Sequence, residues 1–129
     1  MPNFVLSAAH CMVRYVHKYW EAENPRFYVI VAGTTNLWYT PSWQIVTVSA
    51  VFPHAGFDFI TMANDIGMYK LTRALQLTPY VSYAPLPLAV DDSIYRKKNQ
   101  ICSVIGWGKT TQDSSVLLGI KPSAHARAQ

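Results

Sequence analysis

Residues 4–11 of this chain read FVLSAAHC, and this stretch decides the fold. It begins as an apolar run typical of a strand, continues through two small alanines and then presents His10. Histidine titrates near neutral pH, so one held at the end of a rigid element suits a general base. A second stretch, NDIGMYKL at residues 64–71, places the carboxylate of Asp65 just before another apolar run. Asp65 is therefore a candidate to orient that base.

The composition indicates one folded domain. The chain has 129 residues, of which 50% are hydrophobic and 14% are charged, which argues against intrinsic disorder. Eight Tyr, five Phe and four Trp, together with many Val and Ile, favour strands. The formal charge of +4 is mild, and the densest basic cluster, residues 96–98, is too short for a nucleic-acid-binding stripe. No apolar run reaches the roughly 18 to 20 residues of a membrane span.

Turn signals divide the chain into several short strands, which predicts an all-β sandwich or barrel. After the strand end at residues 4–6, residues 8–16 are expected to make one short helical turn. Residues 77–87 carry three prolines and predict an extended connector, and residues 119–129 lack strand periodicity and predict a disordered tail. Four further strands are predicted, at Arg26 to Ala32, Trp43 to Phe52, Ile66 to Leu71 and Ile101 to Gly106.

Three blocks of sequence, the second of them in two parts, follow one another in the order found in the chymotrypsin/trypsin family of serine endopeptidases and resemble that family. FVLSAAHC at 4–11 is similar to the family's W-V-L-T-A-A-H-C block. VFPHAGF at 51–57 and NDIGMYKL at 64–71 are similar to I-x-H-P-x-F and N-D-I-A-L-L-K-L. CSVIGWGKT at 102–110 is similar to C-x-V-x-G-W-G-x-T. The resemblance covers residues 3 to 118 and implies an incomplete trypsin-like double β-barrel.

By this resemblance, His10 matches the catalytic histidine and Asp65 the catalytic aspartate. In the family, the histidine removes the proton of a serine nucleophile, and the aspartate holds the imidazole in the required tautomer. The resemblance thus implies peptide-bond hydrolysis of a peptide or protein substrate, with no cofactor and no metal.

The family's nucleophile block, Gly-Asp-Ser-Gly-Gly-Pro, does not occur in these 129 residues. A family domain holds two barrels in about 200 to 250 residues. We therefore expect residues 1–84 to form a first barrel without its opening strands, residues 85–118 the connector and the start of the second barrel, and residues 119–129 a divergent tail. We expect this chain to be inactive as it stands. The alternatives are a non-catalytic protease-like binding module or decoy, and a non-functional splice product.

The cysteines and remaining histidines have weaker assignments. Taken alone, Cys11 and Cys102 fit one disulfide or two free thiols; the resemblance implies that their partners are absent and that they do not bridge each other. His17 and His54 are expected to be non-catalytic. A metal site built from His10, Cys11, His17 and His54 is disfavoured, because zinc ligands come in compact pairs. The family is typically secreted, although no signal peptide is visible at the N-terminus.

Overall fold

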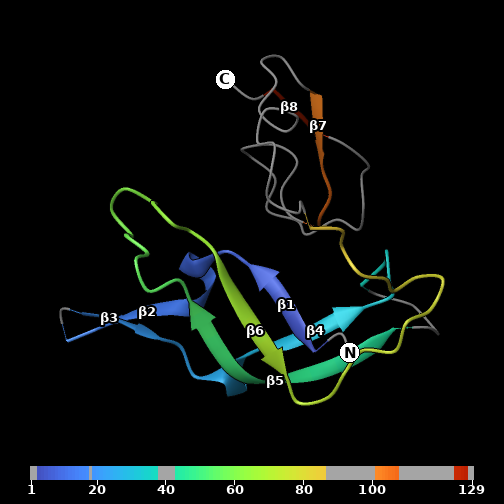
Figure 1. The fold of residues 1–129 in the computed structure, drawn as a ribbon, viewed down its shortest axis with the longest axis horizontal. Helices are drawn as coiled ribbons and strands as arrows, with labels where there is room; N and C mark the ends of the chain where they lie inside the picture. The colour runs from blue at the N-terminus through green and yellow to red at the C-terminus, as the bar shows by residue number, and fades with distance from the viewer. Residues whose placement is uncertain (1–2, 18, 38–42, 87–100, 108–123, 128–129) are drawn as a thin grey trace. The chain divides into compact units, whose positions relative to one another are not determined.

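The structure is a computed structural model that describes residues 3–17, 19–37, 43–86, 101–107 and 124–127 (Figure 1). It divides into two compact units, residues 1–34 with 42–83 and residues 35–41 with 84–129. The described part holds strands and two 3-10 turns and no α-helix, which confirms the all-β prediction. The elements of the first unit are β1 (Phe4–Ser7), η1 (Ala9–Met12), β2 (Val13–Val16), β3 (Tyr19–Ala22), η2 (Pro25–Phe27), β4 (Val29–Ala32), β5 (Gln44–Pro53) and β6 (Gly67–Leu71).

The first unit is organised by a four-stranded antiparallel sheet in the order β1-β6-β5-β4. Strand β6 alternates buried and exposed residues along its whole length, as a strand with one face on the core should. The hydrophobic core is small, and in it side chains from the buried face of β6 pack against side chains from β5 and η1. Its buried members are Met12, Val46, Val48, Tyr69 and Leu71. The predicted strands at 43–52 and 66–71 are confirmed by β5 and β6.

Strand β5 pairs with two neighbouring strands and has a β-bulge at Ser49. The first part of β5 pairs with β4, from Gln44 to Thr47, and the remainder pairs with β6, where the register shifts between Val48 and Ala50. The Ser49 hydroxyl lies at the shift and donates to the carbonyl oxygen of Lys70 at 3.1 Å. Because a bulge bends its strand and increases the local twist, the sheet curves here as a barrel wall does.

The hairpin of β2 and β3 was not predicted. His17, which follows β2, has φ of 48°, the left-handed conformation that a tight hairpin turn requires. All of β3 is exposed, so no core face imposed an apolar alternation on its sequence. Instead, the Trp20 ring stacks on Phe59 with centroids 3.9 Å apart, which ties the hairpin to the loop before β6.

The first half of the predicted strand at 26–32 is wrong. Pro25–Phe27 forms η2, and only Val29–Ala32 forms β4. The physical reason is a helix-start signal: Pro25 lies in the first turn, and the Asn24 side chain accepts the backbone N–H of Arg26 at 3.0 Å. Strand β1 confirms the strand end predicted at 4–6. The 3-10 turn η1 confirms a short turn after it but covers only Ala9–Met12 of the predicted residues 8–16, because Val13–Val16 pairs with β3 as strand β2.

The second unit contains the antiparallel pair β7 (Ile101–Val104) and β8 (Ala124–Arg127). Strand β7 confirms most of the strand predicted at 101–106. Strand β8 corrects the expectation of a tail without strands: Ala-His-Ala-Arg does alternate small apolar and polar residues, and its backbone pairs with β7 along four positions. The Trp107 indole N–H, in this same unit, donates to the carbonyl oxygen of Thr35 at 3.1 Å.

Candidate active site

His10 lies in the single turn of η1, directly after β1. Ala8 is still extended, with φ of −79° and ψ of 140°, and the chain then closes through a hydrogen bond from the Cys11 N–H to the Ala8 carbonyl oxygen at 3.3 Å. Ala9 and Met12 are fully buried, so the turn is anchored to the core on both sides of the histidine. The His10 side chain, in contrast, is 44% exposed.

Asp65 is presented by a tight turn that ends at β6. Asn64 has φ of 56°, a left-handed conformation that asparagine tolerates better than most residues. Its side-chain amide donates to the Gly56 carbonyl oxygen at 2.8 Å, and its own carbonyl accepts the Ile66 N–H at 2.7 Å. These bonds fix the direction in which the next residue, Asp65, leaves the turn.

The sheet brings the two residues together. Strands β1 and β6 are antiparallel, and Ser7 at the end of β1 pairs with Gly67 at the start of β6. The chain after β1 and the chain before β6 therefore meet at one edge of the sheet. Sequence reasoning singled out both residues, although the spacing alone did not reveal this register.

The contact between them involves both carboxylate oxygens. His10 Nδ1 lies 2.7 Å from Asp65 Oδ2, and the His10 backbone N–H donates to Asp65 Oδ1 at 2.8 Å. The backbone N–H of His10, followed by its ring, lowers the pKa of Asp65 below the ordinary value of 3.8, because both bonds favour the carboxylate. With Asp65 ionised, the contact of 2.7 Å favours the tautomer that carries its proton on Nδ1, and in that tautomer the lone pair is on Nε2.

Two tyrosines beside this pair were missed by sequence reasoning. The hydroxyls of Tyr28 and Tyr69 both donate to the Cys11 carbonyl oxygen, at 2.8 and 3.3 Å. Burial, followed by the neighbouring Tyr28, raises the pKa of Tyr69 to about 12, so this hydroxyl remains a donor through neutral pH. No sequence signal links these positions, because both tyrosines lie in stretches that indicate strand.

The other candidate ligands are dispersed. His54 Nδ1 accepts the Gly56 backbone N–H at 3.0 Å within its own turn, and His17 forms the hairpin turn. Within the described ranges no group of three or more His, Cys, Asp or Glu side chains gathers in a way that could hold a metal ion. Cys11 is an exposed free thiol. The side chain of Cys102 lies outside the described residues, so the pairing predicted for it stays a prediction.

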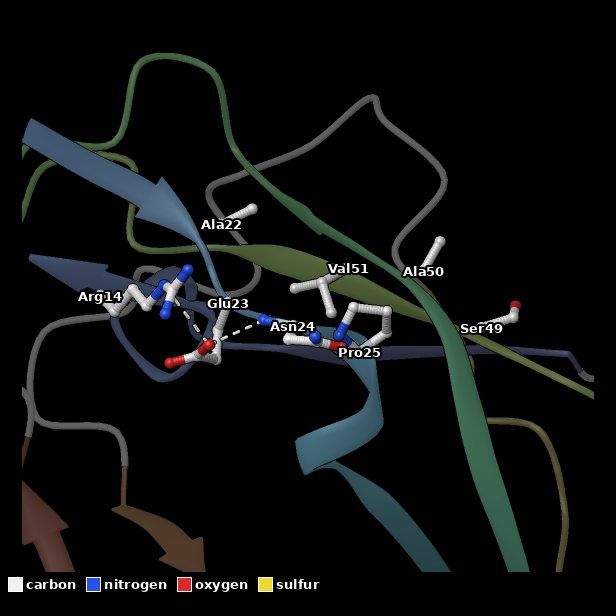
Figure 2. A pocket seen from close by; sticks show the side chains of 8 residues that line it. All are labelled: Arg14, Ala22, Glu23, Asn24, Pro25, Ser49, Ala50 and Val51. Carbon is white, nitrogen blue, oxygen red and sulfur yellow. Dashed lines mark hydrogen bonds and ion pairs between the residues drawn. The ribbon is translucent and has the colours of Figure 1, made fainter. Parts of the chain in front are cut away.

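A pocket of about 510 Å³ is lined by β5 and by the chain from β2 to η2 (Figure 2). Arg14 Nε and Glu23 Oε1 lie 3.5 Å apart in it, so the two charges largely neutralise each other. Neither His10 nor Asp65 is among its lining residues, which are Arg14, Ala22, Glu23, Asn24, Pro25, Ser49, Ala50 and Val51. Its chemistry indicates no reactive group.

Among the described residues no helix is long and apolar enough to cross a membrane.

Comparison with known proteins identifies the family. A sequence profile described as Trypsin matches residues 1–127. The chain belongs to the trypsin family. It is 35% identical over 107 residues to mast cell protease 8 of Mus musculus, covering 83% of this chain and 37% of the relative. It is 31% identical over 115 residues to trypsin I-P1 of Gallus gallus, covering 88% of this chain and 40% of the relative.

A solved structure supports the same fold. The structure described as "Structure of GrC" superposes with a TM-score of 0.68 at 28% identity, covering 89% of this chain and 44% of that one. The chain thus spans less than half the length of these trypsin-family relatives, and its all-β fold is an incomplete trypsin-like double barrel. The profile match extends to residue 127, beyond the limit near residue 118 that the sequence blocks indicated.

Proposed function

We propose that His10 and Asp65 are the general base and its orienting carboxylate in peptide-bond hydrolysis by a trypsin-family serine endopeptidase. The observation that carries the proposal is the contact of 2.7 Å between His10 Nδ1 and Asp65 Oδ2, reinforced by the backbone bond to Oδ1. This arrangement leaves Nε2 as the basic nitrogen on a side chain that is 44% exposed and accessible to a reacting group.

In this mechanism Nε2 takes the proton of a serine hydroxyl as the serine oxygen attacks the scissile carbonyl carbon. Asp65 stabilises the resulting imidazolium without itself being protonated. The imidazolium then gives its proton to the leaving amine, which leaves an acyl-enzyme that water hydrolyses. The serine and the oxyanion-binding amides would come from a complete family domain, because the block Gly-Asp-Ser-Gly-Gly is absent from these 129 residues.

The 129-residue chain by itself is therefore proposed to be inactive. Loss of the nucleophile from an intact enzyme of this type costs on the order of 10⁶ in kcat, and what remains depends on the oxyanion hole and substrate binding. The test is incubation of the purified chain with a serine-directed fluorophosphonate, with intact trypsin as the positive control. We expect no labelled adduct by mass spectrometry. Stoichiometric labelling of this chain would overturn the proposal of inactivity.

A second candidate is a non-catalytic protease-like module that binds a partner. The observation that favours it is the coexistence of an intact His10–Asp65 contact with a sequence that lacks the nucleophile block. The two candidates make different predictions for the longest transcript from the same gene. An in-frame Gly-Asp-Ser-Gly-Gly block downstream supports the protease, and its absence from every transcript supports the binding module or a non-functional splice product. The predicted domain limits, 1–84, 85–118 and 119–129, likewise stay predictions.

A further inference from the structure

The carbonyl group of Cys11 is held by two phenols from distant parts of the chain. Tyr28 follows η2, and Tyr69 lies in the middle of β6. Their rings pack against each other with centroids 4.9 Å apart. Since a carbonyl oxygen offers two lone pairs, it can accept both hydroxyls, at 2.8 and 3.3 Å. We call Tyr28 and Tyr69 the tyrosine pair.

The tyrosine pair is itself firmly placed. Tyr69 is 5% exposed and belongs to the core cluster, and Tyr28 packs against that cluster from its edge. Both rings therefore hold their hydroxyls in position at little further loss of side-chain freedom. Asp65 lies in the turn that leads into β6, and Tyr69 lies four residues further along in β6, so the Cys11 carbonyl is bound to the same chain segment that presents the carboxylate.

The backbone around His10 is consequently fixed on both sides. The N–H of His10 donates to Asp65 Oδ1, and the carbonyl of the next residue, Cys11, accepts from the tyrosine pair. The peptide unit directly after His10 is held by the Cys11 N–H, which donates to the Ala8 carbonyl oxygen at 3.3 Å, and the Cys11 carbonyl belongs to the next unit along the chain. With these three successive peptide units held, the imidazole has little freedom left beyond rotation about its own side-chain bonds. The contact from Nδ1 to Oδ2 fixes that rotation.

We propose that Tyr28 and Tyr69 are positioning residues for His10: they hold the Cys11 carbonyl and so set the backbone from which His10 reaches Asp65. This inference rests on the proposed function of the His10–Asp65 contact. It also explains why two phenols converge on one exposed turn, where a single hydrogen bond would satisfy the carbonyl group. The alternative is a purely structural role, in which the two hydroxyls only stabilise the core.

The test uses Tyr28→Phe, Tyr69→Phe and the double variant of the whole chain, with the pKa of Asp65 followed by carboxyl ¹³C NMR. The largest cause of the lowered Asp65 pKa is the His10 backbone N–H, the group that the tyrosine pair is proposed to position. We expect the pKa of Asp65 to rise in both single variants, more for Tyr28→Phe because its bond is the shorter one. The double variant should show the largest rise.

Two controls separate positioning from general destabilisation. Tyr80→Phe removes a hydroxyl from a side chain that is 73% exposed and should leave the pKa of Asp65 unchanged. The carboxylate of Asp58, which accepts the N–H groups of Ile60 and Thr61 in its own turn, is an internal reference within each spectrum. A purely structural role lowers the unfolding free energy but leaves the pKa of Asp65 in folded molecules unchanged.

The pKa of Asp65 in the variants tests the positioning role of the tyrosine pair. If the pKa of Asp65 stays at the wild-type value in both single variants, the positioning role is overturned, even if the double variant fails to fold. The tautomer of wild-type His10, read from its ring ¹⁵N shifts, tests the proposed function separately. A neutral wild-type imidazole with its proton on Nε2 contradicts the proposed function, whereas a proton on Nδ1 with an unmoved Asp65 pKa contradicts only the role of the tyrosine pair.

Discussion

Gly67 begins β6 directly after the turn that presents Asp65, and replacing it by alanine tests how closely the sheet packs on η1. A Cβ atom at this position would overlap the sulfur of Met12, and it would lie 2.8 Å from the carbonyl oxygen of Phe52 and 3.1 Å from the Cα atom of Pro53. Met12 is fully buried, and the other two atoms belong to the backbone of β5. The Met12 side chain cannot move without disturbing the core, and the backbone of Phe52 and Pro53 cannot move without disturbing the pairing of β5 with β6.

We expect Gly67→Ala to lower the free energy of unfolding by about 1–3 kcal/mol, the usual cost of overpacking a well-filled site. The assay is urea unfolding followed by tryptophan fluorescence, with the slope of the transition checked for constancy. Gly106→Ala is the matched control, because a Cβ atom there meets nothing within 4 Å. That control should change stability by no more than about 0.5 kcal/mol, as surface substitutions usually do.

A double variant isolates the contact with the Met12 sulfur. In a Met12→Ala background the overlap with the sulfur is gone, so adding Gly67→Ala should cost less than it does in the wild type, although the close approach to the Phe52 carbonyl remains. Equal stability of Gly67→Ala and Gly106→Ala would refute the packing described for η1 against β6.

Three further predictions concern the surroundings of the site. Because the pKa of Asp65 is lowered in the folded chain, its carboxylate stabilises the fold above pH 3.8, and this stabilisation is lost as the pH falls through the folded-state pKa. Acid unfolding curves should therefore show a smaller loss of stability for Asp65→Asn than for the wild type. Asn64→Ala should lower the free energy of unfolding by about 1–2 kcal/mol, because alanine tolerates the left-handed backbone at this position poorly. Asn64→Gly should avoid most of this backbone cost, because glycine adopts the conformation freely; urea unfolding of both variants measures the difference. A double-mutant cycle replacing Trp20 and Phe59 by alanine should give a coupling of about 0.5–1.5 kcal/mol, and additive single effects would contradict the ring stack.

The sequence indicated the strands whose faces meet the core. The stretch at 43–52 partly alternates apolar and polar residues, because one side of β5 contributes to the core. In β6 the burial alternates along the whole strand, although exposed Met68 is apolar. Strands β2 and β3 carry no such signal, since β3 is exposed throughout and is held by aromatic contacts with a distant loop. A pattern method cannot detect a strand whose partner, and not its burial, determines its conformation.

The candidate site was predicted in its residues and not in its geometry. Resemblance to the family singled out His10 and Asp65, but their contact depends on the register of β1 against β6, which spacing does not specify. The tyrosine pair escaped prediction for a related reason. Tyr28 and Tyr69 reach the Cys11 carbonyl from separate elements, and each reads in the sequence as an ordinary aromatic strand residue.

The central claim is that Asp65 holds His10 as an oriented base, and the most direct measurement is the tautomer of the neutral His10 ring. Ring ¹⁵N chemical shifts recorded well above neutral pH distinguish a proton on Nδ1 from one on Nε2. We predict that the wild-type chain carries this proton on Nδ1, facing Asp65 Oδ2, and that Asp65→Asn shifts the population toward Nε2. A wild-type proton on Nε2, or the same tautomer in both proteins, would contradict the account.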